Sequence, residues 1–81
     1  MDFKLLFFQQ ISRLSGSEVK CHNHSCYELV YYKHGSGILV LADETTIFDS
    51  GMWALIAPNQ LHSEQHDTNT DVLFIGFEGD R

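Results

Sequence analysis

Apolar and β-branched residues recur along this chain in short runs separated by turn-forming residues. The clearest run spans residues 27–33 and is rich in aromatic and β-branched side chains, which favour extended structure. A Gly-Ser-Gly turn follows at residues 35–37. Further strands are predicted at residues 38–42, 45–48, 52–57, 61–66 and 72–77. About seven short strands at regular spacing are typical of an all-β sandwich or barrel.

Two of the apolar runs carry additional information. In residues 2–14, the spacing of Phe3, Phe7 and Ile11 fits one face of a helix. The apolar residues at the start of this segment also fit a buried strand, and so short a run does not distinguish a helix from a strand. Residues 52–57 are continuously apolar, which predicts a strand covered on both faces. The polar segment at 61–66 is predicted to be a short strand with His66 exposed at its end, and His34 is expected to be exposed beside the glycine turn.

A group of histidines stands at the start of the clearest strand. Side chains of equal parity project to one side of an extended chain, so His22, His24 and Glu28 are predicted to share a face. A third histidine, His62, follows the turn that begins at Pro58. Two or three imidazoles with a carboxylate are suited either to a divalent metal ion or to anchoring a polar ligand.

The composition excludes several classes of protein. With 81 residues the chain forms one domain, residues 1–81, with a modest core. The net charge is −6 and the five basic residues are scattered, so no nucleic acid is expected to bind this chain. No apolar run is long enough to cross a bilayer, and no signal peptide is recognisable, which predicts a cytoplasmic protein without a membrane partner. Cys21 and Cys26 are expected to be reduced thiols.

The spacing of these residues resembles known sequence motifs. His22 and His24, then Glu28 and Gly35, are similar to the first conserved motif of the cupin superfamily, and residues 51–62 loosely resemble the second. Residues 24–32, HSCYELVYY, with the glycine turn, Pro58 and His62, more closely resemble the N-terminal sensing domain of AraC-type transcription regulators. This resemblance covers residues 18–78. The glycine between proline and histidine in the second cupin motif is missing, as is the asparagine after the histidine, which counts against a catalytic metal.

The resemblance implies a fold and an assembly. The expected fold is a cupin-like double-stranded β-helix, or jelly-roll barrel, with a strand at residues 2–14. Jelly rolls use eight strands, so the barrel is expected to be incomplete and the chain to be a fragment without the DNA-binding domain of such regulators. An incomplete barrel exposes a sheet edge that a second copy can cover, which predicts a homodimer.

The resemblance also implies a function. The chain is expected to be the small-molecule sensing and dimerisation domain of an AraC-type regulator, with a sugar-like effector and no enzyme activity. The alternatives are a metal-dependent cupin enzyme of isomerase or dioxygenase type, and a dimerisation module without a ligand. The candidate metal ligands for Zn, Mn, Fe or Ni are His22, His24, Glu28 and His62, although ligand-contacting or structural histidines are favoured over a metal site. The candidate effector contacts are the same four residues with Tyr32 and Trp53, whose rings are suited to stacking on a sugar or aromatic ligand inside the barrel. For each ring taken singly, ordinary filling of the core is favoured over a ligand contact.

Overall fold

The computed structural model describes residues 3–42 and 44–79. It is all-β, as the sequence predicts, and none of these residues forms a helix that could span a membrane. The described residues form eight strands rather than seven, because the segment that ends at His22 forms a strand of its own. The strands are β1 (Phe3–Arg13), β2 (Glu18–His22), β3 (Tyr27–His34), β4 (Gly37–Leu41), β5 (Glu44–Phe48), β6 (Met52–Ile56), β7 (His62–His66) and β8 (Thr70–Gly79).

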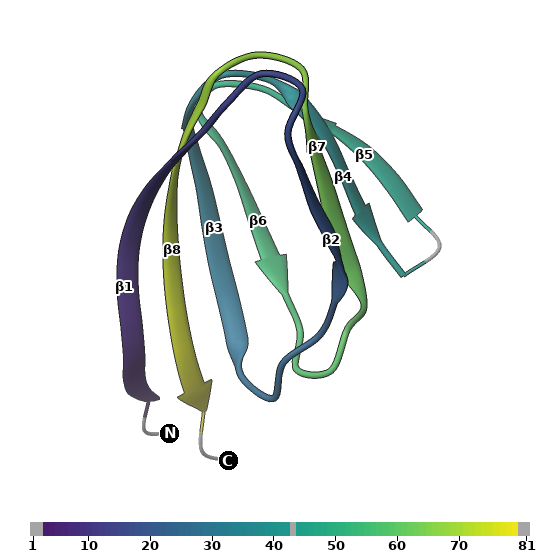
Figure 1. Cartoon of the computed structure of the whole chain (residues 1–81). Coiled ribbons are helices and arrows are strands. Elements are labelled where there is room, and N and C mark those ends of the chain that lie inside the picture. Colours follow the sequence, from purple (N-terminus) through teal and green to yellow (C-terminus); the bar gives the residue numbers. More distant parts are fainter. Residues whose placement is uncertain (1–2, 43, 80–81) are drawn as a thin grey trace.

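The strands form two antiparallel four-stranded sheets that face each other (Figure 1). One sheet has the order β1-β8-β3-β6 and the other has the order β2-β7-β4-β5. The β4–β5 hairpin is the one connection between described strands that stays within a sheet, and the others cross from one sheet to the other. No strand pairing joins the two sheets within the described residues. The result is the predicted jelly-roll type of fold, built as a two-layer sandwich rather than a closed barrel.

The N-terminal segment is the strand β1, so the helical alternative is wrong. β1 pairs with β8 from Phe3 opposite Gly79 to Arg13 opposite Thr70, and a bulge lies between Leu5 and Phe7. The backbone hydrogen bonds that β1 forms along β8 stabilise it as a strand and outweigh its weak helical pattern of apolar residues. A short apolar run adopts the secondary structure that its tertiary contacts favour. Asp2 and the turn residue Asp43 lie outside the described part of the chain.

Apolar side chains fill the half of the interior that lies toward β5 and β6. The rings of Tyr32 and Phe48 stack at its centre with centroids 3.9 Å apart. Leu39 and Ile56 pack around them, and all four side chains are almost completely buried. Aromatic stacking and apolar burial in this half hold the two sheets together.

The prediction that β6 is covered on both faces is wrong. Met52, Ala54 and Ile56 point toward the core, whereas Trp53 is 52% exposed and Leu55 is 56% exposed on the outer face. β6 is the last strand of its sheet, and no second layer covers that face among the described residues. The interior position predicted for Trp53 is therefore also wrong.

Gly37 begins β4 at a point where two other elements come very close. A Cβ atom here would collide with the carbonyl oxygen of Gln65 on the paired strand β7 and would lie 2.5 Å from the ring of Phe48. The backbone of β4 can therefore approach β7 and the core ring only because residue 37 has no side chain.

Replacing Gly37 by Ala is expected to lower the free energy of unfolding by about 1–3 kcal/mol, because the added methyl group forces β4 away from β7 and Phe48. Urea unfolding followed by circular dichroism measures this change. Ser36→Ala is the matched control, since it alters the neighbouring side chain without adding an atom, and its effect is expected to stay within about 0.5 kcal/mol. Equal stability of the Gly37→Ala variant and the wild type would contradict the close approach.

Candidate metal and ligand site

Two connections that cross between the sheets meet at one end of the sandwich. Residues 23–26 join β2 to β3, and residues 57–61 join β6 to β7. The backbone N–H of Asn59 donates to the carbonyl oxygen of His24 at 2.7 Å, which ties the two connections together. Asn59 has a φ of 63°, and the Gln60 side-chain oxygen accepts from the N–H of Ala57 at 3.0 Å. This turn fixes the point at which β7 and its first residue, His62, begin.

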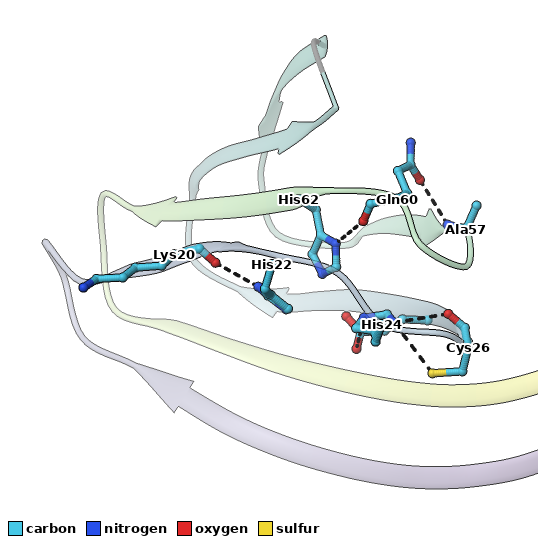
Figure 2. Close-up of polar contacts among 8 residues, drawn as sticks. Lys20, His22, His24, Cys26, Ala57, Gln60 and His62 are labelled. Carbon is cyan, nitrogen blue, oxygen red and sulfur yellow. Dashed lines mark hydrogen bonds and ion pairs between the residues drawn. The ribbon is translucent and has the colours of Figure 1, made fainter.

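His22, His24 and His62 converge at this end (Figure 2). One ring nitrogen from each lies within 4.8 Å of the other two. The ring centroids of His22 and His62 are 4.2 Å apart, and those of His24 and His62 are 5.0 Å apart. His22 is exposed, His24 is half-buried and His62 is buried, so the group runs from the surface into the interior.

Hydrogen bonds to the backbone set the orientation and the tautomer of all three rings. In each ring Nδ1 lies close to a carbonyl oxygen of the same segment (Figure 2). The acceptors are Lys20 at 2.8 Å for His22, Cys26 at 3.1 Å for His24 and Gln60 at 2.8 Å for His62. Because a carbonyl oxygen only accepts, each Nδ1 carries a proton, and in the neutral form of the ring the lone pair is on Nε2. This is the tautomer in which histidine binds metals through Nε2.

Glu28 adds a carboxylate to the histidine group from the facing sheet. Its Oε2 lies 3.4 Å from Nε2 of His24, and the side chain is largely buried. Burial raises the pKa of Glu28, nearby His24 lowers it, and the Glu64 carboxylate raises it again. Two groups that both accept hydrogen bonds face each other here, so a proton or a cation between them is needed to make the contact favourable.

The four predicted residues come together, but not because they share one face of a single strand. The chain is not continuously extended from His22 to Glu28, because β2 ends at His22 and β3 begins at Tyr27 in the other sheet. His22 pairs directly with His62 across β2 and β7, and Glu28 reaches the group from the opposite layer. The single-strand geometry was therefore wrong, although the four side chains share one site.

A second polar group continues the site inward along β7. Glu64 and His66 are buried on the same face of the strand as His62. The Tyr32 hydroxyl donates to Oε2 of Glu64, and Nε2 of His66 lies 3.3 Å from Oε1. Burial and the Glu64 carboxylate raise the pKa of Tyr32, so the phenol keeps its proton and remains a donor.

The expectation that His66 is exposed is wrong, and Glu64 was missed. β7 lies between β2 and β4 in its sheet. Because side chains alternate between the two faces of a strand, its even-numbered residues all point into the space between the sheets. The signal was present in the sequence: His62, Glu64 and His66 alternate with Ser63 and Gln65 at the period of a strand. This alternation is hard to recognise in the sequence because both faces of the strand are polar.

A cavity of about 200 Å³ lies beside these polar groups, on the side of the sandwich formed by β1 and β2. Its polar lining comes from both sheets and its apolar lining from β1, β2 and β8. The lining residues are Phe7, Gln9, Ile11, Arg13, Val19, His22, Glu28, His62, Glu64 and Phe74. The cavity has a size suited to a small organic ligand with direct access to the histidines.

The predicted aromatic contacts do not line this cavity. Tyr32 is fully buried in the apolar half and reaches the polar groups only through its hydroxyl. Trp53 packs against Tyr31 on the outer face of the sheet, with ring centroids 4.4 Å apart and the two rings tilted by 30°. Both cysteines are free thiols, Cys21 exposed and Cys26 buried beside His24.

The donor set fits a divalent metal ion. The Nε2 atoms of His24 and His62 are buried and have no hydrogen-bond partner within residues 3–42 and 44–79. Buried polar atoms without partners are rare and costly. Burial lowers the pKa of His62, and the neighbouring His22 and His24 lower it further, while the Gln60 carbonyl raises it. A neutral, pre-oriented imidazole is the form that binds a metal.

The overall fold is similar to that of solved structures, among them a cupin. A predicted oxalate decarboxylase from Thermotoga maritima is similar with a TM-score of 0.85 and 20% identity, over 94% of this chain and 69% of that one. An RmlC-like cupin from Shewanella frigidimarina has a TM-score of 0.80 and 14% identity, over 98% of this chain and 77% of that one. Salicylate 1,2-dioxygenase from Pseudoaminobacter salicylatoxidans has a TM-score of 0.76 and 22% identity, over 85% of this chain but 19% of the enzyme.

The sequence itself defines the family more narrowly. The family described as the AraC-like ligand binding domain matches residues 7–81. The chain therefore belongs to this family of cupin-like, ligand-binding domains. A search of curated proteins gives no match to the chain.

The lowered pKa of His62 makes a prediction about pH. Because the folded state favours the neutral ring, His62 contributes stability above its ordinary pKa of 6.5, and this contribution is lost as the pH falls through the lower folded value. In chelator-treated protein, the free energy of unfolding of wild type relative to His62→Gln is expected to fall as the pH decreases below 6.5. Denaturant unfolding between pH 7.5 and 4.5 measures it.

The pKa of Glu28 is shifted in the opposite direction from that of His62, so its effect on stability has the opposite pH dependence. Its raised pKa stabilises the folded state below pH 4.5, and that contribution is lost as the pH rises through the folded-state pKa.

The exposed His34 supplies the control for the His62 experiment, because His34→Gln is expected to leave the pH profile unchanged. A His62→Gln profile parallel to that of the wild type would show that the burial of this ring does not control its protonation.

Proposed function

We propose that this chain is the small-molecule sensing domain of a cytoplasmic AraC-type transcription regulator. The observation that carries the proposal is the cavity between the sheets in a chain of the AraC-like ligand binding family. At one end of this cavity lies His62, whose buried Nε2 has no hydrogen-bond partner among the described residues. An effector in this cavity would contact strands of both sheets at once. Binding would therefore change how firmly the two layers are held together, which is a signal that other parts of a regulator can read.

The proposed sensing does not depend on a sugar-stacking platform. Tyr32 and Trp53, the rings predicted to stack on a sugar, lie respectively in the core and on the outer face. The cavity is instead lined by the smaller apolar set of Phe7, Ile11, Val19 and Phe74, together with the polar groups. The proposed effector is therefore a small organic molecule selected by the polar groups at the histidine end.

A divalent metal ion is part of the proposed site. His22, His24 and His62 would hold it through Nε2, and Glu28 would supply an anionic oxygen. A bound ion would provide a positive charge and an open position for an effector oxygen. The protein's own contribution is the pre-orientation of the three rings by carbonyl oxygens, which second-shell hydrogen bonds typically provide.

The same histidine cluster favours a second candidate function, that of a small metal-dependent cupin enzyme of isomerase or dioxygenase type. The two functions differ in what happens to the small molecule. A sensor stabilises the protein and releases its ligand unchanged, whereas an enzyme converts it. Nuclear magnetic resonance of a ligand recovered after long incubation with metal-loaded protein distinguishes them, because new resonances appear only if chemistry occurs.

Replacing His24 by Ala is expected to abolish metal binding, since it removes the ring that contacts both His62 and Glu28. Wild-type protein purified without chelator or histidine tag is expected to contain close to one divalent ion per chain by elemental analysis. At about 100 times the dissociation constant the metal should stabilise the fold by about 2.7 kcal/mol, seen as a chelator-sensitive rise in the thermal midpoint.

The control for the metal experiment is His34→Ala, which removes an exposed histidine from the turn after β3. It is expected to retain the metal and the chelator response. A wild-type protein free of metal, with a thermal midpoint unaffected by added zinc, manganese, iron or nickel ions, would rule out the metal part of the proposal. Sensing by the polar groups alone would then remain.

The outer face of the sheet β1-β8-β3-β6 supports the proposed dimerisation. Phe8, Ile75, Leu29 and Leu55 lie in one row across the four strands. Phe8 is 61% exposed and Leu55 is 56% exposed, and the aromatic pair of Tyr31 and Trp53 lies beside this row. A contiguous exposed apolar patch on a sheet face is typical of an interface, and a second copy of the same patch would cover it.

Leu55→Glu is expected to weaken self-association at least about tenfold, because it places a charge within this apolar row, at its β6 end. Sedimentation equilibrium measures the dimer dissociation constant. Ile47→Glu is the matched control, since Ile47 is 77% exposed but lies in the other sheet, on β5. A wild-type protein that stays monomeric at all accessible concentrations, or equal weakening by both substitutions, would contradict this interface.

A further inference from the structure

Arg13, the last residue of β1, is a cation without a partner at the cavity. It is half-buried, and its Nε atom is buried with no hydrogen-bond partner among the described residues. It lines the cavity together with His22, Glu28, His62 and Glu64, and it is the one Arg or Lys among the described lining residues. An unpaired guanidinium donor shielded from water is unfavourable, so this position is suited to an acceptor supplied from outside the chain.

The strand register places Arg13 far from the histidine end. Phe7 and Glu28 are both opposite Gly76 of β8, whereas Arg13 is opposite Thr70. These two positions on β8 are six residues apart, which corresponds to about 20 Å between backbone atoms along a strand. The cavity wall on β1 therefore runs from the level of Glu28 to Arg13.

The wall between these two polar ends is partly apolar, and Gln9 of β1 and Glu64 of β7 contribute polar side chains to it. Ile11 and Phe74 line it from β1 and β8, and Val19 lines it from β2 on the facing sheet. The rings and methyl groups offer no hydrogen bonds to a ligand, so they favour a hydrocarbon or aromatic body over a polyol. The lining thus combines an apolar slot with a guanidinium at one end.

The charges select among anions. A guanidinium binds carboxylates through two parallel N–H donors. Glu28 and Glu64 line the same cavity, and a dianion such as a phosphate monoester would be repelled by both. A single negative charge held at the Arg13 end, away from Glu28, keeps the attraction and reduces the repulsion.

We propose that Arg13 binds the carboxylate of a small monocarboxylic acid whose apolar body lies against Ile11, Val19 and Phe74. The far end of the acid points toward the histidines. This inference rests on the proposed sensing function, because it names the chemical class of the effector for that cavity. The binding step itself uses Arg13 and the apolar wall and does not require the metal.

The test compares acids with their neutral counterparts on the same chain. The probes are hexanoate and benzoate, their amides hexanamide and benzamide, and glucose as a polyol. Calorimetry and thermal shift are expected to show binding of at least one acid and at least about tenfold weaker binding of its amide, because the amide loses the charge-assisted pair. Arg13→Gln is expected to lower the affinity for that acid about tenfold or more, and Arg13→Lys to lower it less.

The controls separate a binding role from a structural one. Lys33→Gln removes the same charge from an exposed position on β3 and is expected to leave acid binding unchanged. Arg13→Gln is expected to keep the wild-type circular dichroism spectrum and the wild-type metal content by elemental analysis. A purely structural Arg13 would instead lower the thermal midpoint equally with and without the acid.

The outcomes distinguish this inference from the function on which it rests. Equal binding of acids and amides, unchanged acid affinity in Arg13→Gln, or no binding of either acid would overturn the assignment of Arg13. Binding of glucose or the amides alone would leave the sensing function in place while overturning the acid class. A metal-free wild type that still binds an acid through Arg13 would count against the metal site and not against this inference.

Discussion

The structure depends on the burial of a row of polar side chains along β7, between two sheets that are otherwise held together by apolar contacts. His62, Glu64 and His66 all point into this space. Buried polar groups need partners, and the fold supplies some of them: the Gln60 carbonyl for His62, and the Tyr32 hydroxyl for Glu64. The atoms that remain without partners define the site, because they are the positions where an ion or ligand completes the hydrogen bonding.

The two halves of the interior differ in composition: one is a packed apolar core and the other contains the cavity and the polar groups. The half toward β5 and β6 is filled by stacked and interlocked apolar side chains, which leave the sandwich closed there. The half toward β1 and β2 contains the cavity and the polar groups. Tyr32 connects them, since its ring stacks on Phe48 and its hydroxyl reaches Glu64. Rigid packing on one side can therefore hold the polar groups on the other side in place, as a binding site requires.

Much of the fold was predictable because turns and β-rich runs are local signals. The convergence of His22, His24, Glu28 and His62 was also anticipated, but the layers from which they come were not. Parity along one strand says which residues share a face, and it cannot say where a chain leaves one sheet for the other. That crossing is decided by which strands pair, and these partners are distant in sequence.

The crossing connections also determine how the chain can fold. β4 and β5 are the one pair of consecutive described strands that are hydrogen-bonded to each other, and the N-terminal strand β1 pairs with β8. Almost every sheet contact therefore requires closing a long loop first, which places folding at the slow end for a domain of this size. During synthesis, β1 must wait for almost the whole domain to leave the ribosome before its partner exists. Its exposed apolar side chains, such as Leu5 and Phe8, make it the segment most in need of protection in that interval.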